Sequence, residues 1–114
     1  MGLDEKVKSE GPLLAFAGYM PKKGKEDALL TLVGKHVETL RGLGLVSDKI
    51  NYIAKSDDGR IVEVFEWVSG NAVNAAHQHP AIADIWEKMA LVADFPPMNT
   101  LPESNQPFAS FKML

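Results

Sequence analysis

The sequence contains no cysteine among its 114 residues. This absence excludes disulfide-stabilised scaffolds, thiol nucleophiles, iron–sulfur clusters and zinc sites with cysteine ligands. No apolar run approaches the roughly 18–20 residues that a membrane-spanning helix needs, and no apolar core of a signal peptide follows the first methionine. We therefore expect a cytoplasmic protein without a membrane partner.

Basic residues are slightly outnumbered by acidic ones. Twelve Lys and Arg stand against 15 Asp and Glu, which gives a formal net charge of -3. Nucleic-acid-binding domains usually carry a basic stripe. The one dense basic cluster here, Lys22, Lys23 and Lys25, is followed at once by Glu26 and Asp27. Nucleic acid is therefore not expected as a partner.

Nucleotide-binding and nucleophile motifs are also missing. The sequence has no glycine-rich phosphate loop, no dinucleotide fingerprint and no nucleophile elbow, so we expect no cofactor. The length suits one domain, because domains cluster at about 100–150 residues. We expect residues 1–12 to form a flexible tail and residues 13–114 a single domain, with a proline-rich loop over 96–107.

The first half of the chain predicts a buried strand followed by an amphipathic helix. Residues 13–20 contain no charge and end at Pro21, which is typical of a strand buried on both faces. From 26 to 43 the apolar residues recur at helical spacing, and Gly42 and Gly44 predict the end of this helix.

The second half predicts a hairpin, two helical pieces and a last strand. Residues 50–55 alternate between polar and apolar, and residues 60–68 are apolar on both faces apart from one glutamate on each, Glu63 and Glu66. The helical pieces span about 72–77 and 80–92, where Pro80 suits the first turn of the second piece. Residues 108–114 alternate weakly and predict the final strand.

This order of elements predicts an α+β domain. Strand, helix, strand, strand, helix, strand gives a four-stranded antiparallel sheet with two helices on one face and the first and third strands in its centre. Two helices cover only one side of such a sheet, and the other side still carries apolar side chains. We therefore expect a homodimer that packs sheet against sheet.

Three histidines are candidates for acid–base chemistry, because histidine titrates near neutral pH. His36 lies on the apolar stripe of the first helix, as a hydrogen-bonded core residue or as a base that projects into a cavity. His77 and His79 lie just before Pro80. Since residues two apart on a helix point in different directions, they do not form a metal-binding pair, and we expect no metal site.

Aromatic residues are the candidates for the wall of a pocket. Trp67 ends the third strand close to the segment that bears the histidines, and Trp86 lies on the last helix, where core packing is the alternative role. Further candidate lining residues are Tyr19, Tyr52 and Met89. Glu63 and Glu66 need a partner, solvent or a cavity, because an unpaired carboxylate inside an apolar strand is costly.

Several segments resemble the antibiotic biosynthesis monooxygenase family. They are the stretch 62–69, the segment 76–80 with its two histidines, and the opening strand with the residues 21–29 that follow it. The resemblance runs from about 13 to 93. It implies a ferredoxin-like βαββαβ fold that forms dimeric α/β barrels.

The same resemblance implies an activity. Members of the family oxygenate aromatic, quinol-like substrates with O2 and without a metal or an organic cofactor. Carried onto this sequence, Trp67 and His77 match the tryptophan and histidine of the family, and His36 is the other candidate base. The alternative is a non-enzymatic dimeric α/β barrel that binds a small aromatic ligand.

Overall fold

The computed structural model describes residues 11–114, and residues 1–10 of the predicted tail lie outside the described part. The described chain contains five strands and three α-helices. The strands are β1 (Leu13–Pro21), β2 (Val46–Lys55), β3 (Ile61–Trp67), β4 (Ala93–Asp94) and β5 (Lys112–Met113). The helices are α2 (Glu26–Gly42), α3 (Gly70–Gln78) and α4 (Pro80–Val92). Among these residues no helix is long and apolar enough to cross a bilayer.

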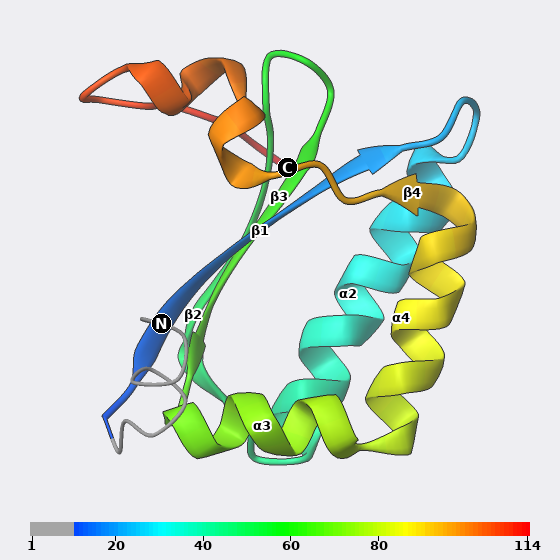
Figure 1. Cartoon of the computed structure of the whole chain (residues 1–114), viewed down its shortest axis with the longest axis vertical. Coiled ribbons are helices and arrows are strands. Elements are labelled where there is room, and N and C mark those ends of the chain that lie inside the picture. The colour runs from blue at the N-terminus through cyan, green and yellow to red at the C-terminus, as the bar shows by residue number, and fades with distance from the viewer. Residues whose placement is uncertain (1–10) are drawn as a thin grey trace.

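The strands form one antiparallel sheet in the order β4-β1-β3-β2-β5. Strand β3 pairs with β1 on one side and with β2 on the other. The prediction that the first and third strands are central is confirmed. Helices α2 and α4 lie side by side against one face of the sheet, and α3 crosses its lower end (Figure 1). The fold is α+β with the ferredoxin-like βαββαβ order.

The fourth strand differs from the prediction. Strand β4 lies beside β1 at one edge of the sheet. It consists of two residues that follow α4 directly and pair with Met20 and Pro21. Of the predicted final strand 108–114, only Lys112 and Met113 form a strand, β5, and it pairs with β2 at the opposite edge. The sheet therefore has five strands and not four. A two-residue strand leaves no alternation in the sequence, so only pairing reveals it.

Helix α2 begins and ends close to the predicted positions. Its buried residues recur every three or four positions, which places one stripe against the sheet. They are Leu29, Val33, His36, Val37 and Leu40. The helix ends at a left-handed residue, Gly44, with φ of +74°. The amides of Gly44 and Leu45 donate to the carbonyls of Arg41 and Leu40 and satisfy the helix end.

Two side chains fix the boundary between β3, α3 and α4. The Ser69 hydroxyl accepts a hydrogen bond from the amide of Ala72 and caps α3. His79 caps α4, because its Nδ1 accepts from the amide of Ala81. Pro80 then occupies the first turn of α4, where its missing N–H is not needed. The predicted break between two helical pieces is therefore confirmed.

The two faces of the sheet have different surroundings. Odd-numbered residues of β1 and β3 point toward the helices, and we call this the inner face. Even-numbered residues point away from them, on the outer face. The register pairs Ala17 with Glu63 on the inner face and Phe16 with Val64 on the outer face. Glu63 is fully buried, whereas Phe16 is 53% exposed.

The proline-rich segment is held to the sheet by two buried charged residues. Residues 98–105 form two short 3₁₀ turns. The Arg60 guanidinium donates to Asp58 and to the carbonyl and hydroxyl of Thr100. Glu103 accepts from the Ser56 hydroxyl at 2.7 Å and the Asp57 amide at 2.8 Å. Burial raises the pKa of the Glu103 carboxyl, but these hydrogen bonds outweigh burial and hold the pKa below its usual value.

Candidate active site

A row of polar side chains divides the core in two. One apolar cluster contains Leu29, Val33, Ile61 and Met89, and the other contains Val37, Leu40, Phe65 and Ile82. On β3 the residue between Ile61 and Phe65 on the inner face is Glu63. On α2 the turn between the two clusters carries His36, and on α4 Trp86 packs against both clusters. Strand β1 contributes Tyr19.

Glu63 is the centre of this row. The Tyr19 hydroxyl donates to Glu63 Oε1 at 2.7 Å, and His36 Nδ1 lies 3.1 Å and 3.2 Å from the two carboxylate oxygens. None of the Glu63 surface is exposed. Burial raises the pKa of the Tyr19 hydroxyl well above 10.0, and the charge and hydrogen bond of Glu63 raise it further. Tyr19 therefore keeps its proton at neutral pH and shares it with a buried carboxylate.

The hydrogen bonds of His36 identify its tautomer. The indole Nε1 of Trp86 donates to His36 Nε2 at 3.0 Å, and an indole N–H only donates. His36 Nε2 is therefore the acceptor, and Nδ1 carries the proton that is donated to Glu63. Both ring nitrogens are occupied and the residue is only 3% exposed. Of its two predicted roles, the structure favours the hydrogen-bonded core residue.

An aromatic pocket opens beside this row. It has a volume of about 300 Å³ and is lined by Tyr19, His77, Trp86 and Phe95. Tyr19 meets the edge of Phe95 with ring centroids 5.8 Å apart. His77 lies against Trp86 with centroids 5.1 Å apart. Both ends of the Tyr19–Glu63–His36–Trp86 chain therefore reach the same pocket, while its two middle members are buried behind it.

His77 is the exposed histidine of this pocket. Its Nδ1 lies 2.8 Å from the carbonyl oxygen of Val73, one turn earlier on α3. Because a carbonyl oxygen only accepts, Nδ1 carries a proton, and in the neutral imidazole Nε2 is the nitrogen with the lone pair. In its neutral form His77 thus combines contact with the pocket and a ring nitrogen, Nε2, that can accept a proton. This arrangement suits a general base.

The predicted site residues divide into three groups. Tyr19, Trp86 and His77 come together at the aromatic pocket, with His36 behind it. Trp67 packs edge-on against Phe65 at 5.1 Å and is not among the residues that line this pocket. Met89 is 1% exposed inside the apolar core. It packs the core and does not line the pocket.

Tyr52 lies on the other side of the sheet. Strand β2 pairs Tyr52 with Val64 of β3, which places its side chain on the outer face, where it is 52% exposed. The structure therefore does not bring Tyr52 to the pocket of Tyr19; Tyr52 lines the hollow on the outer face. An aromatic residue in an alternating strand lies on whichever face the register selects, and the pocket occupies only the inner face.

Two residues of the site were not predicted as part of it. Glu63 had a visible signal, a carboxylate inside an apolar strand, but its partners Tyr19 and His36 come from β1 and α2. Phe95 gave no signal, because it follows the two-residue strand β4 in an irregular segment. Only the pairing of β4 with β1 brings it to the pocket.

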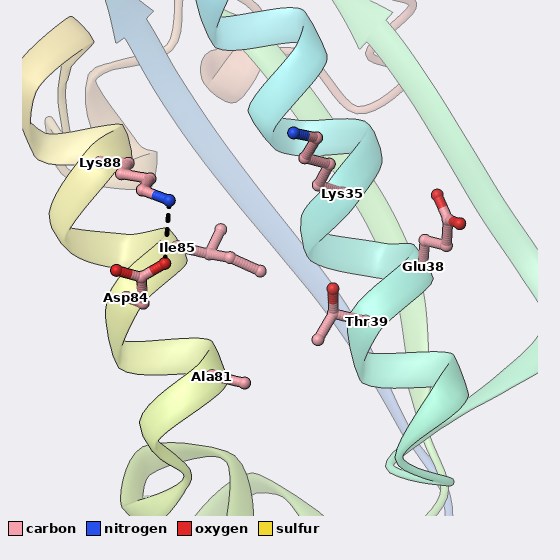
Figure 2. A pocket seen from close by; sticks show the side chains of 7 residues that line it. All are labelled: Lys35, Glu38, Thr39, Ala81, Asp84, Ile85 and Lys88. Atoms are coloured by element: carbon pink, nitrogen blue, oxygen red, sulfur yellow. Dashed lines mark ion pairs between the residues drawn. The ribbon is translucent and has the colours of Figure 1, made fainter.

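Two other hollows have a different character. One, of about 520 Å³, lies between α2 and α4, and its lining includes four exposed charged side chains, Lys35, Glu38, Asp84 and Lys88 (Figure 2). Lys88 pairs there with Asp84 at 3.0 Å (Figure 2). The second, of about 430 Å³, lies on the outer face and is lined almost entirely by apolar side chains. Neither contains a buried acid–base pair. Within residues 11–114, no three His, Asp or Glu side chains are grouped as a metal ion would require.

Fold and site together define an α+β domain that has an aromatic pocket beside a buried carboxylate. No family model matches the sequence, and no curated protein matches it. Similar solved structures include those of two proteins. Protein Rv0793 from Mycobacterium tuberculosis has a TM-score of 0.62 at 18% identity, over 75% of this chain and 87% of that one. Protein SO0527 from Shewanella oneidensis has a TM-score of 0.61 at 19% identity, over 76% and 86%. At this identity the similarity establishes the fold.

Proposed function

We propose that this protein is a cofactor-independent monooxygenase that oxidises a phenolic, quinol-like aromatic with O2. The observation that carries the proposal is His77, whose Nε2 lone pair is available at a pocket walled by Tyr19, Trp86 and Phe95. The aromatic walls suit a flat, apolar ring. The resemblance of the sequence to the monooxygenase family supports the same reaction.

In the proposed reaction His77 Nε2 takes the proton of the substrate hydroxyl. The resulting phenolate is paired with the protonated imidazole, and an unsubstituted ring carbon ortho or para to the oxygen becomes electron-rich. O2 adds at that carbon, takes up an electron pair and receives a proton, which gives a hydroperoxide. Loss of the C–H proton and cleavage of the O–O bond then release water and leave a dione. The balance is one phenol and one O2 to one dione and one water.

The test is oxygen uptake with a panel of quinols. The enzyme and quinol are mixed without oxygen, O2 is admitted, and uptake is followed for wild type and for His77→Asn. Removal of a general base lowers kcat by about 10²-fold to 10⁴-fold, and we expect a loss in that range. His79→Asn is the matched control, since His79 lies two residues away and caps α4. We expect it to keep wild-type turnover.

The same assay separates the enzyme from the alternative, a barrel that only binds an aromatic ligand. Saturable binding without oxygen uptake on any quinol would favour the binding protein and reject the monooxygenase. Equal turnover of the two asparagine variants would reject His77 as the base and leave the identity of the reaction unaffected.

We also propose that two copies associate through the outer face of the sheet. Leu14 is 57% exposed there, next to Phe16 at 53% and Tyr52 at 52%, and these side chains line the apolar hollow of about 430 Å³. Monomeric proteins rarely leave an apolar patch of this kind in water. A second copy with the same face would cover it by a twofold interface.

Sedimentation of the purified chain tests this association. We expect about twice the 12.5 kDa of the single chain at micromolar concentration. Phe16→Glu places a charge in the patch and should give monomers. Leu91→Glu is the matched control, because Leu91 is 75% exposed on α4, away from the outer face. A stable species of single-chain mass in wild type would contradict the proposal.

A further inference from the structure

The protons of the pocket's polar side chains are all donated away from it. The Tyr19 hydroxyl donates to Glu63 at 2.7 Å. The Trp86 N–H donates to His36 at 3.0 Å, and the proton on His77 Nδ1 is donated to the carbonyl of Val73 at 2.8 Å. What remains for a ligand is the lone pair of the Tyr19 oxygen and that of His77 Nε2. Phe95, the fourth lining residue, has no polar group.

Glu63 imposes this direction. A carboxylate has only acceptors, and Glu63 receives one proton from Tyr19 and another from His36. The chain runs from Trp86 through His36 to Glu63 at one end and from Tyr19 to Glu63 at the other. Both ends therefore donate inward, toward one residue that is wholly buried and does not line the pocket.

We propose that Glu63 is the specificity-determining residue that makes the pocket select ligands with two hydrogen-bond donors. An aromatic diol donates one hydroxyl to Tyr19 and the other to His77. The corresponding dione has the same ring but only acceptors, so it leaves both pocket acceptors without a partner. A site that is built for one hydrogen-bond pattern rejects the analogue that lacks it. The inference rests on the proposed function, whose substrate is a phenolic, quinol-like aromatic and whose product is a dione; here the diol and the dione serve as probes of the two hydrogen-bond patterns.

Replacement of Glu63 by glutamine should reverse the direction of the hydrogen bond between residue 63 and the Tyr19 oxygen. The glutamine amide has nearly the same shape, but it carries an NH2 donor as well as an oxygen acceptor. With the amide oxygen at the Oε2 position, where it accepts from His36 Nδ1, the amide nitrogen takes the Oε1 position and donates to the Tyr19 oxygen. The Tyr19 proton is then free to point into the pocket and to serve a ligand that accepts.

Binding is measured in the absence of oxygen, so that no turnover occurs. The ligands are 1,4-dihydroxynaphthalene and 1,4-naphthoquinone, titrated by calorimetry; the chain has no cysteine that could add to the quinone. We expect wild type to bind the diol at least tenfold more tightly than the dione, and Glu63→Gln to lose or invert this ratio. Glu66→Gln is the control, the same change on the outer face of the same strand.

Three outcomes would overturn the inference. They are equal binding of diol and dione by wild type, an unchanged ratio in Glu63→Gln, and no binding of either ligand to the folded protein. If Glu63→Gln fails to fold, Tyr19→Phe replaces it: the ring stays, the acceptor is lost, and diol binding should fall about tenfold while dione binding is unchanged. A diol preference without any oxygen uptake would keep this inference and reject the monooxygenase.

Discussion

The hydrogen bond between Tyr19 and Glu63 makes a specific prediction for stability. Tyr19→Phe removes one hydroxyl and keeps the ring, which is 7% exposed among the apolar residues of the core and meets Phe95. A hydrogen bond to a charged, buried acceptor contributes about 1.5–3 kcal/mol. We therefore expect the free energy of unfolding at pH 7 to fall by about that amount.

The free energy of unfolding should depend on pH differently in wild type and in Tyr19→Phe. Burial and Glu63 raise the pKa of Tyr19 in the folded protein above the 10.0 of the unfolded chain. The stabilisation is thus fully present below pH 10 and is lost as the pH rises, by about 1.4 kcal/mol per pH unit. Tyr19→Phe lacks this loss. The difference in stability between wild type and variant should therefore shrink by about 1.4 kcal/mol between pH 9 and pH 11.

Urea unfolding followed by the fluorescence of Trp67 and Trp86, at one protein concentration and several pH values, measures both effects. Thr31→Val is the control, because it removes a hydroxyl from an exposed side chain on α2, away from the outer face. We expect the free energy of unfolding of this control to differ from that of wild type by less than about 0.5 kcal/mol. If Tyr19→Phe unfolds at the same urea concentration as wild type, and the two profiles stay parallel up to pH 11, the buried Tyr19–Glu63 bond is refuted.

Three further predictions concern the rest of the fold. Glu103→Gln should lower the stability at pH 7 by about 1–3 kcal/mol. The variant should also lose less stability than wild type as the pH falls. The lowered pKa of Glu103 gives wild type a stabilisation that is present above pH 4.5 and is lost in acid. Urea unfolding between pH 3 and pH 7 measures both the loss at pH 7 and the pH dependence. Arg60→Lys keeps the charge but loses the forked contacts with Asp58 and Thr100, so the Leu101 amide should exchange hydrogen about tenfold faster by NMR. Ser69→Ala removes the cap of α3 and should cost about 1 kcal/mol in thermal unfolding.

Local patterns predicted most of the elements correctly. The stripe of α2 needs only the 3.6-residue period, and its end needs only a glycine that tolerates a positive φ, which Gly44 supplies. The two faces of β3 follow from strict alternation, which places Glu63 and Glu66 on opposite faces, as in the structure. Each of these inferences uses interactions within a few residues of the chain.

Inferences about the site failed or stayed open where they depended on distant segments. Tyr19 and Tyr52 both lie in predicted strands, yet only the pairing of β1 and β2 with β3 shows that they lie on opposite faces of the sheet. The two roles considered for His36 could be separated only by its neighbours, Trp86 from α4 and Glu63 from β3. Neither neighbour is close to it in sequence.

The sequence by itself determined the α+β class, the central position of β1 and β3, and the need to partner a carboxylate in the middle of an apolar strand. These follow from periodicity and from the cost of burying charge, which act locally. The tertiary structure alone decided that Tyr19 and His36 satisfy Glu63, that β4 brings Phe95 to the pocket, and that His77 lines the same pocket. A hydrogen bond between residues that are 27 or 44 positions apart depends on how the elements pack. A local sequence pattern therefore does not predict it.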